Sequence, residues 1–377
     1  MTTVRAVSSL VGVVMALRVL VSGGGIAGLA SAIALARRGI DVDVVERSET
    51  WRTNGAGISL YPNGDRVLRA LDLDEVVASA GFRIERLRIL DGSGTSMGEF
   101  PFGTWPGVGG TVAIHRDVLQ QVLLAASSAS VRLGLTVREI VARDEAPRVT
   151  FTDGTAGDYD VVVVAEGIRS ATRAVVFGPI EPRPVGQMYW RTAVPALLVD
   201  TLTMVAAEDR FVSMMPIGGG QTYVAVQTRS DAVAVAPGER IQSMRAATTG
   251  LGGVVQDVLA AITADEDVFV GPAEEVAQTH WRHGRVVLVG DASHALSPSF
   301  GQGANLALED AYVLGEELAS NSGIDAALDA YVERRAPRVA FVQERTAERI
   351  ALVNRGANQR DLHAATQLVE AHLSTPI

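Results

Sequence analysis

Apolar runs and glycine turns alternate at the start of the chain. Leu17–Val21 is a continuous apolar run, Leu29–Arg38 is rich in alanine and leucine and ends at Gly39, and Ile40–Val45 is a second apolar run. Short apolar runs are typical of strands that are buried on both faces, and the stretch between them has the composition of a helix. This order predicts one βαβ unit with a glycine turn at its first joint.

The same patterns predict elements along the rest of the chain. Residues 51–62 are expected to form a loop, and residues from about 181 to 275 a sheet-bearing insertion. The charged run Glu333–Arg349 is expected to be a solvated helical face with i,i+4 pairs. Strands are predicted at Arg86–Leu90, Met97–Phe100, Val131–Arg143, Arg148–Thr152, Asp160–Ala165, Gln187–Ala193, Arg210–Pro216, Tyr223–Thr228 and Val286–Gly290, and helices at Asn63–Leu71, His115–Ala126, Ile241–Thr248, Val254–Ile262, Gln302–Ser320 and Asp325–Val353.

Composition excludes several kinds of chemistry. The 377 residues include no cysteine, which rules out disulfides, thiolate metal sites and cysteine nucleophiles. The six histidines lack the spacing of metal ligands, so no metal site is expected. The formal net charge is −10 and no Lys/Arg run offers a basic stripe, which argues against a nucleic-acid partner. Difficult chemistry would therefore depend on something other than a thiolate or a metal.

The N-terminal segment resembles a signal peptide, because one arginine precedes an apolar run. The run continues into the predicted strand Leu17–Val21, so cleavage there would remove part of the fold. We therefore expect residues 1–14 to be a dispensable extension, with Met15 as an alternative start, and the protein to be cytoplasmic. Apolar stretches fall short of the roughly 20 residues that span a bilayer, so no membrane span is expected.

The first candidate binding motif is Gly23-x-Gly25-x-x-Gly28, between the first predicted strand and helix. The first glycine permits a tight turn, the second lets backbone N–H groups approach a pyrophosphate, and the third allows close helix–strand packing. Glu46, at the end of the next strand, is placed to accept hydrogen bonds from ribose hydroxyls, with Arg47 beside it. This combination predicts a dinucleotide site.

A second candidate motif follows the predicted strand Val286–Gly290. Asp291 stands at the carboxyl end of that strand, where ligands bind in open α/β sheets, and could hold a second sugar-like chain such as a ribityl group. The turn Gly301-Gln302-Gly303 frees backbone N–H groups at a helix start, which would stabilise an anion on a ring nitrogen. Asp291, Ser293 and His294 also suggest a hydrolase triad, but near neighbours on one loop rarely reach triad geometry. His294 is expected to be a structural hydrogen-bonding residue.

The two motifs together resemble the FAD-dependent aromatic hydroxylases, single-component flavoprotein monooxygenases similar to p-hydroxybenzoate and salicylate hydroxylases. The resemblance is carried by GGGIAGLASAIALARRGIDVDVVER and GDASHALSPSFGQGANLALEDAYVLGEEL and extends over residues 17–350. Glu166 stands where that family usually has aspartate. The resemblance implies that Pro298, Gly301, Gln302 and Gly303 shape the flavin site without an obligatory acid or base, and that FAD is bound by Gly23, Gly25, Gly28, Glu46, Arg47, Gly57, Arg116, Glu166, Asp291, Gly303, Ala304 and Asn305.

The resemblance also implies a fold and a reaction. The expected fold is a three-layer α/β FAD-binding domain (residues 15–85, 110–180 and 276–353) interleaved with a smaller mixed β-sheet substrate domain (86–109 and 181–275), with a helical tail at 354–377. Bound FAD, transient NADPH or NADH and O₂ would hydroxylate or epoxidise an aromatic or polycyclic molecule through a C4a-hydroperoxyflavin, in a monomer or homodimer. The alternatives are a flavin-dependent reductase or dehydrogenase and a non-catalytic FAD-binding protein.

Candidate substrate residues lie on predicted strands of the insertion. Alternation along a strand places Tyr189 and Arg191 on one face and Trp190 on the other. Arg191 and Tyr223 could orient an acidic or phenolic substrate, because they offer a cation and a phenol. Met214 is the fourth candidate, whereas Trp190 and Met215 are expected to belong to the core.

Overall fold

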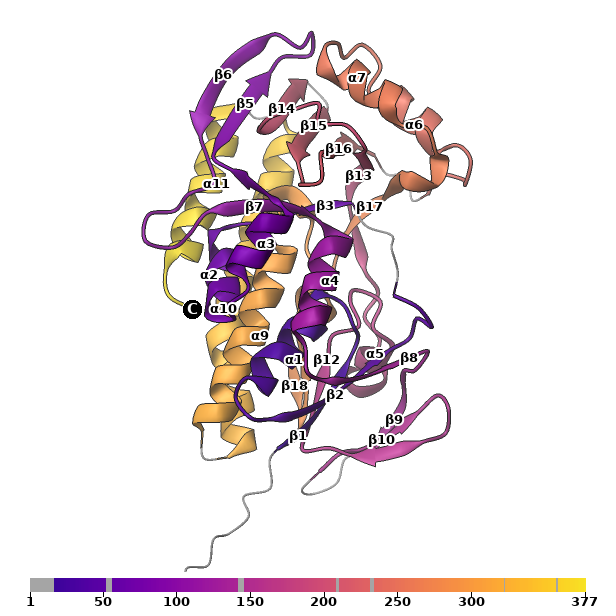
Figure 1. Cartoon of the computed structure of the whole chain (residues 1–377), viewed down its shortest axis with the longest axis vertical. Helices are drawn as coiled ribbons and strands as arrows, with labels where there is room; N and C mark the ends of the chain where they lie inside the picture. Colours follow the sequence, from indigo (N-terminus) through magenta and orange to yellow (C-terminus); the bar gives the residue numbers. More distant parts are fainter. Residues whose placement is uncertain are drawn as a thin grey trace, which may run out of the picture.

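The computed structural model describes residues 17–51, 56–141, 146–207, 210–230, 234–321, 323–356 and 359–377. The extension predicted at residues 1–14 lies outside these ranges. Two large sheets stand one above the other, with long helices along one side (Figure 1).

The lower sheet has the order β18-β19-β12-β1-β2-β8, and all of its pairings are parallel except that of β18 with β19. Its strands come from distant parts of the chain, as expected for one interleaved sheet. Their bounds are β1 Arg18–Ser22, β2 Asp41–Glu46, β8 Ser130–Leu133, β12 Val161–Val164, β18 Arg282–His283 and β19 Val286–Leu288.

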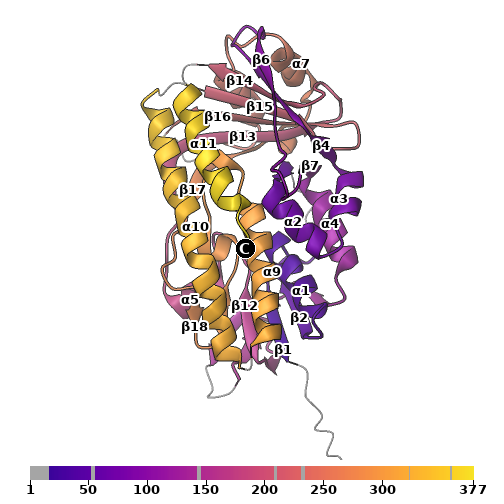
Figure 2. The ribbon, with the colours of Figure 1, turned by 90° about the vertical axis from the view of Figure 1, so that its left-hand side faces the viewer.

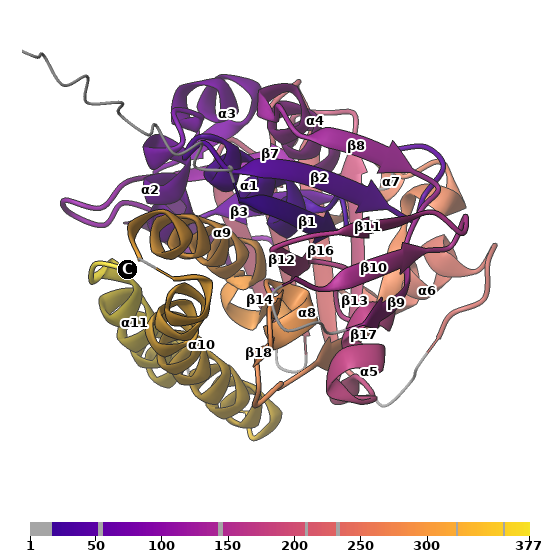
Figure 3. The same cartoon turned by 90° about the horizontal axis from the view of Figure 1, so that it is seen from below.

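Side chains alternate between the two faces of this sheet, and both faces are covered by other elements. Val19 and Val21 pack toward the helices, whereas Leu20 packs against a small antiparallel sheet on the other face. That small sheet consists of β9 Val137–Val141, β10 Arg148–Phe151 and β11 Ala156–Asp158, with α5 Ala171–Phe177 next to it. Seen from below, the helices α1 Ile26–Ala36 and α9 Gly303–Ser320 and the small sheet lie on opposite sides of the parallel strands (Figure 3). The three-layer α/β architecture is therefore confirmed.

The upper sheet has the order β17-β13-β16-β15-β14-β5-β6 and is mixed, since β14 pairs with β5 in parallel. The helices α6 Arg240–Ala247 and α7 Val254–Ala261 cover its outer face (Figure 1). The strands are β5 Arg86–Leu90, β6 Ser96–Pro101, β13 Arg183–Val194, β14 Leu202–Ala207, β15 Arg210–Pro216, β16 Thr222–Arg229 and β17 Phe269–Glu275, with the 3-10 turn η1 Asp265–Asp267 before β17.

Between the two sheets lies a three-stranded sheet that the sequence patterns did not predict. Residues 51–62 were expected to be loop, but β3 Gly57–Leu60 pairs with β7 Thr111–His115, which also pairs with β4 Phe82–Ile84. The equally short β12 and β19 are continuous runs of valine and leucine, whereas β3 (GISL) and β4 (FRI) contain a glycine, a serine or an arginine and so show no apolar run. The helices α2 Pro62–Ala70, α3 Asp74–Ala80 and α4 Arg116–Ala126 pack beside them.

Two further expectations about elements were wrong, and two strands of the insertion were not predicted. The strand predicted at Val131–Arg143 is two strands, because the chain turns at Gly134 with φ +69°. In the insertion, β14 and β17 were missed. The charged run Glu333–Arg349 does not simply face solvent: Arg335 and Arg338 are buried against Glu309. Their partner, Glu309, lies on a different helix, which faces the charged run. The sequence of the charged run alone therefore does not show that these two arginines are buried.

The C-terminal part of the chain forms helices that pass both sheets. Helix α10, Ile324–Asn354, runs from the lower sheet to the upper one, and α11, Gln359–Ser374, packs back against it (Figure 2). At its upper end, Arg229 of β16 donates a hydrogen bond to the carbonyl oxygen of Asn354 (2.8 Å). The short elements α8 Asp291–His294 and η2 Pro298–Phe300 connect β19 to α9.

Candidate active site

The turn between β1 and α1 needs its three glycines for different reasons. A Cβ at Gly28 would lie 1.8 Å from the carbonyl oxygen of Gly23, and a Cβ at Gly23 would lie 2.4 Å from that of Ala165. Gly23 also has φ +114°. At Gly25, the N-cap of α1, a Cβ would meet no atom within 4 Å. The open space at the helix N-terminus is therefore at Gly25, where a phosphate group can approach the backbone.

Glu46 lies at the carboxyl end of β2, next to this turn. Its carboxylate accepts hydrogen bonds from the backbone N–H groups of Gly24 (2.8 Å) and Ser48 (3.0 Å). From the other side, the Gln120 amide of α4 donates to the carbonyl oxygen of Gly24 (2.9 Å). Sequence reasoning missed Gln120, because nothing in its own helix indicates which loop that helix faces.

Three other predicted FAD residues lie at the start of α4, at the start of β3 and after β2. The backbone N–H of Arg116, at the start of α4, donates to the carbonyl oxygen of Ala56 (3.0 Å), and the Arg116 side chain is exposed. Arg47 is also exposed, directly after β2. Gly57 is needed for packing, since a Cβ there would lie 2.6 Å from Tyr223.

The second motif forms the turn between β19 and α8. Gly290 has φ +61°, and Asp291 follows as the first residue of α8. The Asp291 side chain is exposed and forms no hydrogen bond to any residue that the structure describes. Its Oδ1 would lie 3.7 Å from a Cβ at Gly303, the first residue of α9. Asp291 and Gly303 are therefore neighbours, with a free carboxylate between two turns.

A buried cluster lies behind Asp291. Asp310 of α9 accepts hydrogen bonds from the Gly290 backbone N–H (2.9 Å), from His294 Nε2 (2.6 Å) and from Arg335 Nε (2.8 Å). Burial would raise the pKa of Asp310, but His294 and Arg335 outweigh it and hold that pKa at about 2. His294 is thus the structural residue that the sequence indicated. Ser293 Oγ donates to the Gly290 carbonyl oxygen (2.9 Å), so no triad forms.

Glu166 follows β12 and is surrounded by donors. Its carboxylate accepts from the hydroxyls of Ser22 (2.6 Å), Ser170 (2.7 Å) and Thr172 (2.5 Å), and from the Thr172 backbone N–H (2.9 Å). Its placement next to the cofactor strands agrees with the motif, but its oxygens bind the protein. A direct contact between Glu166 and FAD stays a prediction.

The segment from Pro298 to Asn305 is held in place by contacts with residues 59–63. Gly301 has φ +65°, and a Cβ there would lie 2.9 Å from the Tyr61 ring. Gln302 is buried and accepts from Asn63 Nδ2 (3.2 Å). The Asn305 amide bonds the backbone of Ser59, Tyr61 and Gly301, so its side chain holds β3 to α9. Ala304 is half-buried at the start of α9.

One of the substrate candidates was wrong. Met214 is fully buried with Trp190 in the core under α6 and α7, so it faces away from the lower sheet. Met215 lies on the opposite face in contact with the Tyr223 cluster, and accepts a hydrogen bond from Ser59 Oγ (3.2 Å). The run Met214-Met215-Pro216 gives no alternation by itself, and the pairing of Met215 with Tyr223 sets the register.

Tyr189, Arg191 and Tyr223 do share one sheet face, as the register of β13 with β16 shows. Tyr189 and Tyr223 are buried, and burial raises the pKa of Tyr189 to about 12. The Tyr189 phenol therefore stays protonated at neutral pH. Arg191 Nε is buried and has no partner among the described residues.

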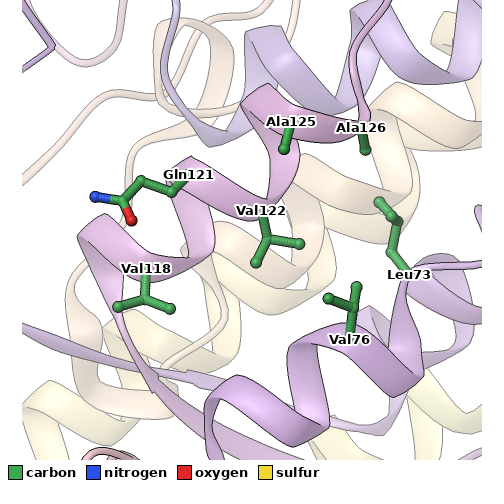
Figure 4. Close-up of a pocket in the computed structure, with 7 residues that line it drawn as sticks. All are labelled: Leu73, Val76, Val118, Gln121, Val122, Ala125 and Ala126. Atoms are coloured by element: carbon green, nitrogen blue, oxygen red, sulfur yellow. The ribbon is translucent and has the colours of Figure 1, made fainter.

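A separate surface groove offers no such chemistry. It has a volume of about 420 Å³, lies between α3 and α4, and is lined by Leu73, Val76, Val118, Gln121, Val122, Ala125 and Ala126 (Figure 4). Gln121 is the single polar side chain of that lining, so we do not place the reaction there. The described residues contain no group of three acidic or histidine side chains that could hold a metal ion. None of the described helices is long and apolar enough to cross a membrane.

The residues present fit FAD. The carboxyl ends of β1, β2, β12 and β19 meet at one edge, which is where open α/β sheets bind nucleotides. At that edge, Gly25 leaves room that no protein atom fills, and Asp291 offers a carboxylate without a partner. These features define an α/β dinucleotide-binding protein, and the resemblance to the aromatic hydroxylases implies that the dinucleotide is FAD.

Comparisons with known proteins identify the family. Residues 16–346 match the family model described as FAD binding domain, and the chain belongs to this family. It is 34% identical over 352 residues to 3-amino-4-hydroxybenzoate 2-monooxygenase of Streptomyces cremeus, with 89% of this chain and 87% of the relative covered. It is 31% identical over 338 residues to 2-heptyl-3-hydroxy-4(1H)-quinolone synthase of Pseudomonas aeruginosa, with 87% of each covered.

A solved structure agrees over nearly the whole chain. The crystal structure of Klebsiella pneumoniae HpxO with FAD and uric acid superposes with a TM-score of 0.86 at 27% identity, and covers 96% of this chain and 97% of that one. The expected family and fold are therefore confirmed. The chain is an FAD-dependent monooxygenase and therefore an oxidoreductase.

Proposed function

We propose that this monooxygenase takes electrons from NADPH or NADH and inserts one atom of O₂ into a small aromatic or polycyclic molecule bound against the inner face of the upper sheet. The observation that carries this proposal is the pairing of an open FAD cradle at Gly25 and Asp291 with a sheet face that holds Tyr189, Arg191 and Tyr223. Phenols and a cation on one sheet face suit an aromatic ring with a polar substituent.

The protein's contribution is binding, orientation and exclusion of water. Gly23, Gly25 and Gly28 shape the turn that would take the pyrophosphate, and Glu46 and Asp291 would bind the sugar and ribityl hydroxyls. The backbone N–H groups of Gln302 and Gly303 lie at the start of α9 and would stabilise negative charge on the flavin ring. The Gly301 N–H does not contribute, because it donates to the Pro298 carbonyl oxygen (2.9 Å). When bound, FAD supplies the hydride acceptance and oxygen activation.

Two tyrosines can hold a proton near the substrate without releasing it. Burial raises the pKa of Tyr61 to about 12, and Tyr189 has the same value for the same reason. Both therefore act as hydrogen-bond donors at neutral pH, rather than as bases. No described side chain on this face is placed as a strong general base, which agrees with chemistry carried by the cofactor.

The test is oxygen incorporation. The purified holoenzyme is assayed for NADPH and NADH oxidation with a panel of phenols, aromatic acids and polycyclic quinones, under ¹⁸O₂, while peroxide is measured alongside. We expect a ligand that stimulates oxidation and a product that carries one ¹⁸O atom. Oxidised product without ¹⁸O would instead support a flavin-dependent reductase or dehydrogenase. Bound FAD with no NAD(P)H oxidation for any ligand would support a binding protein.

Two finer expectations belong to this proposal. We propose a cytoplasmic enzyme that works as a monomer or homodimer. Cell fractionation tests the first point, and sedimentation equilibrium of the holoenzyme tests the second.

A further inference from the structure

Two arginines near Tyr189 lack a carboxylate partner. Arg191 lies on β13 and Arg349 on α10, and neither forms an ion pair with a carboxylate that the structure describes. Elsewhere on α10 the pattern differs, since Arg335, Arg338 and Arg345 each pair with a glutamate. Partly buried cations without an anion are costly unless a ligand completes them.

Both arginines lie in the surroundings of Tyr189. The Arg349 guanidinium lies over the Phe300 ring at 5.3 Å from its centre. The residue before Phe300, Ser299, forms a hydrogen bond with the hydroxyl of Ser297 (2.9 Å). The Ser297 hydroxyl donates to Gln187 Oε1 (3.3 Å), and the Tyr189 hydroxyl donates to the same oxygen (3.4 Å). Arg191 is two residues along β13 from Tyr189, on the same face. The positive charges of both arginines lower the pKa of Tyr189, against the larger effect of burial.

The C-terminal helix fixes Arg349 on one side only. Arg349 Nη1 donates to the Leu362 carbonyl oxygen (3.0 Å) and to Thr366 Oγ1 (3.3 Å), both on α11. Nε and Nη2 form no hydrogen bond within the described part of the chain. Glu370, the α11 carboxylate that raises the pKa of Tyr61, contacts Trp105 instead. Figure 2 shows α10 and α11 beside the upper sheet, where this arrangement lies.

We propose that Arg191 and Arg349 together bind a carboxylate on the aromatic substrate, so that Arg349 is a specificity residue supplied by the C-terminal helices. The proposal rests on the proposed function and narrows its substrate class to aromatic acids. A planar guanidinium with two free donor positions matches a carboxylate, and such charge-assisted hydrogen bonds are stronger than neutral ones. Tyr189 would then contact the ring or its hydroxyl.

The experiment is ligand binding to the oxidised holoenzyme, without NAD(P)H. Matched probes are salicylate, 4-hydroxybenzoate and 3-amino-4-hydroxybenzoate, each with its primary amide, and binding is followed by calorimetry and by the FAD absorbance change. We expect at least one acid to bind about tenfold or more tighter than its amide. Arg349→Gln should weaken that acid about 10- to 100-fold and leave the amide unchanged.

Controls separate charge from structure. Arg345→Gln, one turn earlier on α10 and paired with Glu344 and Glu348, should bind the acid like the parent. Arg349→Lys should restore part of the lost acid binding, because it restores the charge. Thr366→Val tests the support from α11 and should weaken the acid by a smaller factor.

The outcomes distinguish the two proposals. Equal binding of every acid and its amide, absence of binding by all three acids, or an Arg349→Gln variant that binds an acid like the parent would each overturn the carboxylate site. The proposed function would survive any of these if a neutral aromatic ligand still stimulated NAD(P)H oxidation with ¹⁸O incorporation.

Discussion

His294 and Asp310 form a fully buried pair, with Nε2 2.6 Å from Oδ2. The same Asp310 oxygen, Oδ2, also accepts a hydrogen bond from the backbone N–H of Gly290. The pair therefore lies directly behind the turn that carries Asp291. Arg335 of α10 reaches the second carboxylate oxygen. One side chain of α9 thus connects the cofactor turn to the long helix.

Asp310→Asn is expected to destabilise the protein by about 3–5 kcal/mol, because it leaves the fully buried Arg335 with an incomplete set of negative partners. Urea unfolding followed by circular dichroism measures this loss. Asp200→Asn is the matched control: it removes an exposed pair with Arg88 and should cost at most about 1 kcal/mol. Similar losses for the two variants would contradict the role given to Asp310.

Protonation of Asp310 in acid should remove part of this stabilisation. The folded pKa of Asp310, at about 2, lies below its ordinary value of 3.8, so its contribution is fully present above pH 4 and is lost as the pH falls from about 4 to 2. The amount is about 2 kcal/mol. It is measured as the free energy of unfolding against pH, together with ¹³C NMR titration of aspartate carboxyl carbons. A normal titration of Asp310 near pH 4 would sink this prediction.

Gly25→Ala and Gly28→Ala should behave differently. The added Cβ at Gly25 meets no protein atom, so the apoprotein should fold, but FAD should bind about tenfold or more weakly because the methyl occupies the phosphate side of the turn. The Cβ at Gly28 would overlap the Gly23 carbonyl oxygen, so that variant should lose both fold and FAD. Thermal unfolding with and without FAD separates the two. Normal FAD affinity in Gly25→Ala would contradict the cradle.

Asp291→Ala should lose FAD without losing the fold. Its side chain is exposed and has no described hydrogen-bond partner, so the stability of the apoprotein should change by less than about 0.5 kcal/mol. Flavin content after gel filtration and FAD titration of the apoprotein measure the effect. Asp257→Ala, an exposed carboxylate on α7, is the control that should keep its FAD. A purified Asp291→Ala variant with one FAD per chain would refute the role.

Glu166→Asp tests the residue that departs from the family pattern. The shorter side chain cannot keep its hydrogen bonds to Ser22 and Thr172 at once, so we expect a loss of about 1–3 kcal/mol in unfolding free energy. Glu239→Asp, exposed before α6, should change stability little. If Glu166→Asp has the same unfolding free energy as the parent, the longer side chain of Glu166 does not stabilise the fold.

The sequence predicted the parts of the site that depend on local patterns. The glycine turn, Glu46 and Asp291 follow apolar strands directly, so strand ends and turn residues place them without knowledge of the rest. The small sheet of β3, β4 and β7 escaped prediction because β3 and β4 lack the continuous apolar run that marks the equally short β12 and β19. Such strands form through pairing rather than through their own periodicity.

The sheet face to which a side chain points could be predicted only where the register of its strand could be predicted. Tyr189 and Arg191 share a face by simple alternation, whereas Met214 and Met215 are both apolar and could exchange faces. Arg335 and Arg338 look like surface residues until Glu309 of α9 is placed against them. Arg349 and Gln120 had no signal of their own, since each acts on an element that only the tertiary fold brings near.

Helix α10 has a consequence for recombining this protein with its relatives. Its 31 residues, with Pro337 in the interior, correspond to about 45 Å of helix. It contacts the upper sheet near its end, where Gln343 donates to the Val276 carbonyl oxygen and Arg229 to that of Asn354. A chimera that exchanges only residues 183–275 would place a foreign sheet against the parental helices. The sheet itself includes β5 and β6 from residues 86–101, so selectivity would have to be transplanted as three distant chain segments: 86–101, 183–275 and the C-terminal helices.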